Sequence, residues 1–326
     1  MWLAISVSLI SFAVALLAVG WLARSRAAGL AIDEPNARSL HTAPVPRTGG
    51  IGLLLGIASG WSLITTNFPW PVWAALAIVI AISLVDDLRG LPAAIRLAAH
   101  LLAAALAATA LLGSESPMPV FLTVLAIGWM CNLYNFMDGS DGLAGGMALS
   151  GFLAYAIAAW LSGSTQFALL NLAIAAAAAG FLVHNFHPAR IFLGDAGSVP
   201  LGFLAAACGL TGWLQHDWTW WFPVLVFSPF IVDASATLSR RLLIGARVWE
   251  AHRDHYYQRL VQLGFGHRKT ALMEYGLMVL CAISGLWIMT LENTAQYMLL
   301  ATAGTLYLAI ILLIEHLWRT RSHQRA

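Results

Sequence analysis

Long apolar runs separated by short polar segments recur along the whole chain. A helix crosses about 30 Å of hydrocarbon with about 20 apolar residues. Runs that approach this length occur at 1–22, 50–67, 70–85, 92–113, 118–134, 146–163, 166–184, 199–214, 219–239, 271–290 and 296–317. The longest polar segment, 240–270, is too short to fold around its own core. The pattern predicts an all-α polytopic membrane protein with about eleven transmembrane helices in one integral-membrane domain, residues 1–326.

The composition agrees with this pattern. Hydrophobic residues make up 60% of the chain and charged residues 10%, whereas roughly 25% of an average soluble domain is charged. The first apolar run lacks a preceding basic segment and is too long for the core of a signal peptide. We therefore expect it to be a retained helix.

The charges separate the two sides of the predicted helices. All 17 Lys and Arg fall on one side, while the opposite connectors hold Glu115, Asp217 and Glu292 with aromatic residues nearby. Basic loops favour the cytoplasm and aromatic residues favour the interface. We therefore expect an outside N-terminus and a cytoplasmic C-terminus. Several basic residues are interpreted only as topology determinants: His267, Arg268, Lys269, Arg319, Arg321 and Arg325.

Five compact polar clusters share the predicted cytoplasmic side. They are the segment 33–50, the pair Asp86-Asp87, the segments 132–146 and 184–198, and the loop 240–270. An ionisable group in hydrocarbon costs at least ~2.5 kcal/mol, so groups at a membrane edge usually face water, bind ions or carry out chemistry. The clusters therefore predict one functional site at this face.

The loop 240–270 contains a helical spacing. His252, Tyr256 and Arg259 follow the pattern i, i+4, i+7, which is typical of an amphipathic helix. We expect that helix to lie over the membrane surface or over a substrate. Asp233, deeper in the ninth run, has two interpretations: it lines the cavity, or it pairs with a polar neighbour.

The clusters hold the side chains that phosphoryl transfer requires. Mg²⁺ prefers one or two carboxylates together with substrate phosphates, and no His or Cys pair has the spacing of a zinc site. Six oxygen-bearing side chains could bind such an ion: Asp86, Asp87, Asn135, Asp138, Asp141 and Asp195. Four side chains could bind a pyrophosphate through charge-assisted hydrogen bonds: Arg47, Arg190, Arg253 and His255. The last two could instead attract anionic lipid.

Glycines flank the acids in the segments 132–146 and 184–198. Glycine permits a positive φ and lets backbone N–H groups approach an anion closely. We therefore expect these glycines to make room for a phosphate group.

The motifs resemble those of the polyprenyl-phosphate N-acetylhexosamine-1-phosphate transferases, a family that includes phospho-N-acetylmuramoyl-pentapeptide transferase. The family's His-x-x-Pro-x-Pro-Arg-x-Gly-Gly loop matches 41–50, and its Asp-Asp pair matches Asp86-Asp87. Its Asn-x-x-Asn-x-x-Asp-Gly-x-Asp-Gly-Leu element matches 132–143, and its Gly-Asp-x-Gly-Ser element matches 194–198. The motifs occur in the family's order and on one side of the membrane.

The resemblance implies roles for these residues. It implies that Asn135 and Asp195 coordinate Mg²⁺, with Mn²⁺ as a substitute. It also implies that the catalytic acids Asp86 and Asp87 lie beside the lipid phosphate, and that the loop 240–270 closes on the sugar nucleotide.

Three motif residues keep alternative interpretations. We place Asp138 with the catalytic acids and Asp141 with the substrate-binding residues. Either residue could instead contact the nucleotide or support the metal ligands. Asn132 either contacts substrate in the site or forms a hydrogen bond with a neighbouring helix.

The resemblance also implies a reaction. A phosphate oxygen of undecaprenyl phosphate would attack the β-phosphorus of a UDP-N-acetylhexosamine, releasing UMP and leaving the first sugar of an O-antigen-type surface polysaccharide on a lipid diphosphate. Family members that act on UDP-N-acetylglucosamine often carry a His-rich run where this chain has His255-Tyr256-Tyr257-Gln258. The donor sugar therefore stays open among the N-acetylglucosamine, N-acetylfucosamine and N-acetylquinovosamine types.

The resemblance implies a bacterial inner (cytoplasmic) membrane with the active site on the cytoplasmic face. The expected partners are undecaprenyl phosphate, the UDP-sugar and the lipid bilayer, with no nucleic acid. The oligomeric state, a homodimer included, stays open.

A secondary transporter of an anionic solute is the alternative function. Transporters usually bind their substrate near the bilayer midplane, between related repeats. Here the acids lie at predicted helix ends and no repeat relates the two halves of the chain. A scaffold protein with an amphipathic loop is a third option, but it leaves the acidic clusters unexplained.

Overall fold

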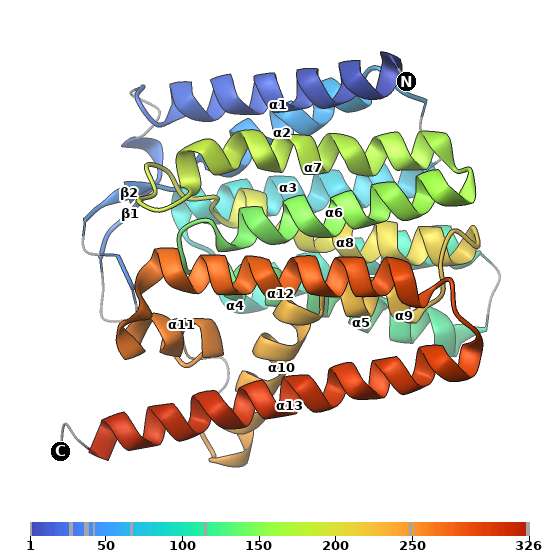
Figure 1. Ribbon diagram of the computed structural model, residues 1–326. Helices are drawn as coiled ribbons and strands as arrows, with labels where there is room; N and C mark the ends of the chain where they lie inside the picture. The colour runs from blue at the N-terminus through green and yellow to red at the C-terminus, as the bar shows by residue number, and fades with distance from the viewer. Residues whose placement is uncertain are drawn as a thin grey trace.

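Helices make up nearly all of the regular structure. The computed structural model describes residues 2–25, 29–35, 39–41, 43–65, 68–113, 116–247, 250 and 252–323. The long helices lie side by side, and the two ends of the chain lie at opposite ends of the bundle (Figure 1). Glu115 and Arg325, which entered the charge argument, lie outside the described residues.

The helices include at least one in each predicted apolar run, and a short one, Tyr256–Leu260, in the predicted loop 240–270. In chain order they are α1 (Trp2–Leu22), α2 (Gly49–Trp61), α3 (Trp70–Arg89), α4 (Ala93–Leu112), α5 (Pro117–Phe136), α6 (Leu143–Ser162), α7 (Thr165–Asn185), α8 (Asp195–Leu214), α9 (Trp221–Val226), α10 (Ser228–Leu243), α11 (Tyr256–Leu260), α12 (Gly266–Ile288) and α13 (Asn293–His323). Within the described ranges, 9 helices are long and apolar enough to cross a membrane. The prediction of an all-α polytopic membrane protein is therefore confirmed, while the count of eleven crossings and their orientation stay predictions.

Two predicted crossings differ from the others. Helix α2 has only 13 residues, and the ninth run is divided into α9 and α10 at Phe227. Pro229 lies in the first turn of α10, where its missing N–H is tolerated but would interrupt a continuous helix. The chain changes direction there, and α10 crosses between α12 and α13 (Figure 1).

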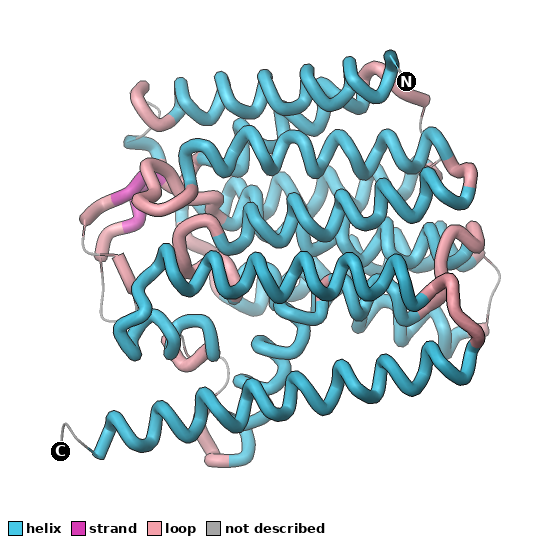
Figure 2. Tube along the Cα trace, viewed as in Figure 1, coloured by secondary structure: helices cyan, strands magenta, loops and turns pink. Residues whose placement is uncertain are grey.

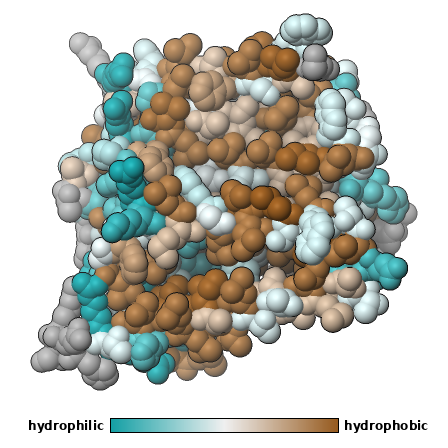
Figure 3. Space-filling view, viewed as in Figure 1, coloured by the Kyte–Doolittle hydropathy of each residue, from teal (hydrophilic) through white to brown (hydrophobic). Residues whose placement is uncertain are grey.

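The centre of the bundle consists of α6, α7 and α8. In their most apolar 18-residue stretches, 72%, 67% and 78% of the residues are buried inside the protein. Small residues permit this close packing: a Cβ at Gly180 of α7 would lie 2.5 Å from the carbonyl oxygen of Phe12 in α1. Apolar side chains cover the middle of the face shown in Figure 3, and hydrophilic side chains gather toward its ends.

The polar loops meet at the end of the bundle that carries β1 (Ile32–Asp33), β2 (Val45–Pro46) and α11 (Figure 2). The two short strands pair antiparallel, with Ile32 opposite Pro46. The predicted start of a helix at His252 is wrong, because the α-helix begins only at Tyr256. Tyr256 and Arg259 are buried, and both contact Glu315 of α13.

Candidate active site

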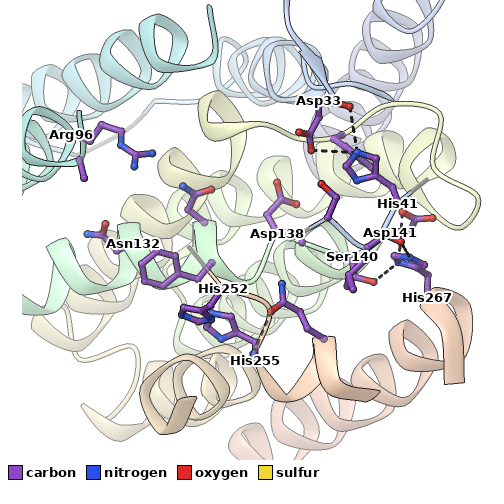
Figure 4. A pocket seen from close by; sticks show the side chains of 18 of the residues that line it. Asp33, His41, Arg96, Asn132, Asp138, Ser140, Asp141, His252, His255 and His267 are labelled. Carbon is purple, nitrogen blue, oxygen red and sulfur yellow. Dashed lines mark hydrogen bonds and ion pairs between the residues drawn. The ribbon is translucent and has the colours of Figure 1, made fainter. Parts of the chain in front are cut away.

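A cavity of about 500 Å³ lies at this polar end of the bundle. Figure 4 shows Asp138 near its centre, with Arg96 on one side and Ser140, Asp141 and His267 on the other. The charged and imidazole side chains that line it come from several separate segments: Asp33, His41, Arg96, His100, Asp138, Asp141, Glu250, His252, His255 and His267. Polar groups that are far apart in the sequence are thus collected around one space.

The Asp86-Asp87 pair joins the end of α3 to the beginning of α8. Asp87 accepts the backbone N–H groups of Asp195 at 3.1 Å and Ala196 at 2.8 Å. Arg47 donates from Nη2 to the carbonyl oxygen of Asp87 at 2.8 Å. Asp87 therefore caps α8, where the positive end of the helix dipole favours a carboxylate. Arg47, predicted to bind pyrophosphate, thus lies beside Asp87.

Arg96 of α4 links two of the predicted acids. Its Nη1 lies 2.9 Å from Asp86 Oδ2 and 3.3 Å from Asp195 Oδ2. Asp86 also accepts the backbone N–H of Leu91. Arg96 lines the cavity, whereas Asp86, Asp87 and Asp195 do not, so the guanidinium connects the buried acids to the open space.

The end of α5 supplies the residues closest to the middle of the cavity. Asn132, Asn135 and Asp138 all line it. Asn135 Oδ1 accepts a hydrogen bond from Ser198 Oγ at 3.0 Å, which places it beside the first turn of α8. Asn132 donates to the carbonyl oxygen of Gly128 in its own helix at 2.8 Å, and among the residues that the structure describes it forms no hydrogen bond to a neighbouring helix.

Asp138 is partly buried and lies near other carboxylates, with no cationic side chain of the described residues beside it to favour its ionised form. Burial, and then the nearby carboxylate of Asp195, raise the pKa of Asp138 well above its ordinary value. Among the described residues, no hydrogen bond or ion pair to its carboxylate is present. A cation beside Asp138 would favour the ionised form and lower this pKa again.

Asp141 lies beside two imidazole rings. His187 Nδ1 lies 2.6 Å from Asp141 Oδ2, and Ala189 N–H donates to the same oxygen at 3.1 Å. His267 Nδ1 is 3.9 Å from Asp141 Oδ1 and 2.9 Å from Ser140 Oγ. Asp141 therefore joins the segment after α5, the segment after α7 and the beginning of α12.

The loop after α10 contributes His255 to the cavity. Its Nδ1 lies 3.3 Å from Asp233 Oδ1. Asp233 also accepts the backbone N–H groups of Tyr256 at 2.9 Å and Tyr257 at 2.8 Å. Of the two interpretations of Asp233, pairing with polar neighbours is the observed one, because its carboxylate caps α11.

Three of the four side chains predicted to bind pyrophosphate do not line the cavity: Arg47, Arg190 and Arg253. Arg47 contacts Asp87, and both Arg190 and Arg253 are exposed to solvent. Substrate contact by these three arginines stays a prediction. Of the arginines that the structure describes, only Arg96 lines the cavity.

The glycine that precedes α8 packs against protein atoms. Gly194 has φ +73°, and a Cβ there would lie 2.3 Å from the carbonyl oxygen of Arg47 and 2.8 Å from Asp87 Oδ2. Glycine is required by this conformation and this close approach. Gly194 thus makes room for Asp87 and Arg47, and the predicted space for a phosphate is not observed at this position.

The oxygen ligands suit Mg²⁺ better than zinc. The described residues contain no group of three or more His, Cys, Asp and Glu side chains arranged to hold a metal by themselves. Mg²⁺ does not require such a cage, because it keeps several waters and uses one or two carboxylates with substrate phosphates. The Asn135 amide oxygen and the unpartnered Asp138 carboxylate at the cavity fit this requirement. Asp195 begins α8, the helix whose first turn contacts Asn135 through Ser198.

Sequence reasoning missed Arg96, His187 and His267. Arg96 was counted only as a positive charge and His267 only as a topology determinant. Their partners lie 99 residues away for the Arg96–Asp195 pair and 127 residues away for the His267–Ser140 pair. The available signal was their location within or beside the polar clusters of the predicted cytoplasmic side.

Comparison with known proteins gives a consistent set of relatives. The family described as "Glycosyl transferase family 4" matches residues 69–212. The chain is 28% identical over 275 residues, 78% of this chain and 76% of the relative, to the "Probable undecaprenyl-phosphate N-acetylglucosaminyl 1-phosphate transferase" of Bacillus subtilis (strain 168). It is 29% identical over 294 residues (75% of this chain, 72% of the relative) to the "Decaprenyl-phosphate N-acetylglucosaminephosphotransferase" of Mycobacterium tuberculosis (strain CDC 1551 / Oshkosh). A Staphylococcus saprophyticus "Phospho-N-acetylmuramoyl-pentapeptide-transferase" is 29% identical over 177 residues (53% of this chain, 54% of the relative).

Proposed function

We infer that this multi-pass membrane chain, which is similar to glycosyl transferase family 4 over residues 69–212, is a member of that family, and we propose that it transfers a sugar 1-phosphate from a UDP-N-acetylhexosamine to a polyprenyl phosphate. The observation that carries the proposal is the meeting of Asn135, Asp138 and Arg96 around one cavity at the polar end of the helix bundle. Carboxylates and a guanidinium in one space suit phosphoryl transfer, which depends on positioning and charge stabilisation.

The acceptor that we propose is undecaprenyl phosphate in a bacterial inner membrane, with the cavity facing the cytoplasm. One relative is named for undecaprenyl phosphate and another for decaprenyl phosphate, which supports a polyprenyl acceptor. A phosphate monoester with a second pKa near ~6 is largely ionised at neutral pH. A strong general base is therefore not required for its attack.

The reaction exchanges one phosphorus–oxygen bond for another. An acceptor phosphate oxygen forms a bond to the β-phosphorus of the UDP-sugar, the bond from that phosphorus to the bridging oxygen breaks, and UMP leaves with the bridging oxygen. The Asn135, Asp138 and Asp195 oxygens would hold Mg²⁺, or Mn²⁺ in its place, which would offset the charge of the pyrophosphate. Arg96 contacts the carboxylates of both Asp86 and Asp195 and so holds them close to each other at the edge of the cavity.

The donor that we propose is a UDP-N-acetylhexosamine of the N-acetylglucosamine, N-acetylfucosamine or N-acetylquinovosamine type. The relatives are named for N-acetylglucosamine, which supports the first. The chain's Tyr257 and Gln258, in place of a His-rich run, favour the other two. Gln258 lines the cavity beside His255, where a donor sugar would meet it. We also propose that the lipid-diphosphate-linked sugar is the first sugar of an O-antigen-type polysaccharide.

One assay tests the proposal. Purified protein in lipid nanodiscs would be mixed with undecaprenyl phosphate, Mg²⁺ and each UDP-sugar in turn, and UMP and the lipid diphosphate product would be measured. UMP release that requires the acceptor lipid is expected with at least one donor. Absence of UMP with all donors, from protein that keeps a cooperative unfolding transition, would contradict it.

A further inference from the structure

His267 follows directly after the reversal between α11 and α12. Gly264 and Gly266 have φ +96° and +70°, a conformation that favours glycine, and His267 is the second residue of α12. Its side chain lines the cavity on the side opposite Arg96 (Figure 4). The imidazole thus lies where the chain returns from the loop 240–265 to the membrane.

One imidazole connects three segments of the chain. His267 Nε2 lies 3.3 Å from the carbonyl oxygen of Leu40, and Nδ1 lies 2.9 Å from Ser140 Oγ. A carbonyl oxygen only accepts hydrogen bonds, so Nε2 carries the proton in the neutral ring and Nδ1 accepts the Ser140 hydroxyl. His267 therefore joins α12 to the segment 39–41 and to the segment 137–142.

His187 completes the arrangement around Asp141. The His187 and His267 rings are stacked, with centroids 5.6 Å apart and an angle of 8° between their planes. Asp141 Oδ2 lies 2.6 Å from His187 Nδ1 and accepts the backbone N–H of Ala189 at 3.1 Å. The Asp141 carboxylate is therefore oriented from the segment after α7, while His267 holds the neighbouring Ser140.

We propose that His267 is a positioning residue, which holds the Ser140-Asp141 segment against α12 and so sets the donor side of the cavity for the UDP-sugar. The inference rests on the proposed function. A ring that joins three segments keeps the wall of the cavity in one arrangement before substrate arrives. Such preorganisation improves binding because less ordering is needed on association.

The test compares His267→Ala with His267→Gln and with Ser140→Ala. His267→Ala is expected to raise KM for the UDP-sugar by about 3- to 10-fold, equivalent to one lost hydrogen bond, while kcat changes less than about 2-fold. Glutamine can reach the Leu40 carbonyl oxygen, so His267→Gln should recover part of the change. Ser140→Ala removes only the Nδ1 contact and should show a smaller increase. His316→Ala, at an exposed position of α13, is the matched control and should behave as wild type.

Hydrogen exchange of the segment 137–142 gives a second readout that does not require turnover. In His267→Ala and Ser140→Ala these amides are expected to exchange faster than in wild type, and in His316→Ala at the wild-type rate. Unchanged KM together with unchanged exchange in both variants would overturn the positioning role. If wild type releases no UMP, the proposed function fails, and faster exchange would support only the structural connection through His267, not the setting of a donor site.

Discussion

The carboxylate of Asp87 caps the helix that begins at Asp195, accepting the N–H of Asp195 at 3.1 Å and that of Ala196 at 2.8 Å. Asp87→Ala should therefore lower stability as well as activity. Loss of a helix cap costs about 1 kcal/mol, and the side chain is only 5% exposed. The measurement is thermal unfolding in detergent together with UMP release. Lost activity with an unchanged unfolding temperature would indicate that Asp87 acts on substrate and not through α8.

Arg96→Gln should reduce UMP release by about 10- to 100-fold, the range found when a partner that orients metal ligands is removed. The reason is that Arg96 contacts Asp86 and Asp195 together, and without it two carboxylates repel each other. Arg96→Lys should recover part of the rate. Arg89→Gln, at the exposed end of α3, is the control. Equal rates for Arg96→Gln and Arg89→Gln would show that the bridge is not needed.

Asp195→Ala should reduce turnover at ordinary Mg²⁺ by at least about 100-fold, comparable to removal of a group that stabilises transition-state charge. Chelation of divalent ions by EDTA should stop wild-type turnover, and added Mg²⁺ or Mn²⁺ should restore it. Asp217→Asn is a suitable control, because Asp217 accepts hydrogen bonds from Ser162 and Ser164 near the ends of α6 and α7 that lie away from the cavity. Near-normal UMP release by Asp195→Ala would contradict the metal assignment.

Asp233→Ala should loosen the loop that leads to α11. The backbone N–H groups of Tyr256 and Tyr257 would lose their acceptor, and an unsatisfied buried group costs about 1–3 kcal/mol. Limited trypsin digestion should then cut faster after the exposed Arg253. Ser235→Ala, two residues along α10, serves as the control. Equal cleavage rates in both variants would show that Asp233 does not hold the loop.

The helices were predictable because hydrocarbon thickness dictates their length and composition, so each apolar run contains a helix. The grouping of motif residues at one end was also predictable from the charge pattern. The environment of Arg259 was not. Its guanidinium lies over the rings of Tyr256 and Trp318 and donates to Glu315 at 2.7 Å. The spacing of residues within a loop contains no information about a partner 56 residues away. The sequence therefore predicts a surface helix where the structure has a buried one.

Tethering of α11 from both sides limits how this enzyme can be re-engineered. Asp233 of α10 holds the beginning of α11, and Glu315 of α13 holds Arg259 near its end. A chimera that exchanges only the loop 240–265 would take Arg259 away from Glu315, and its new backbone would have to present two N–H groups to Asp233 in the same geometry. A graft intended to change the sugar donor should therefore carry α10 through α13, residues 228–323, as a single cassette.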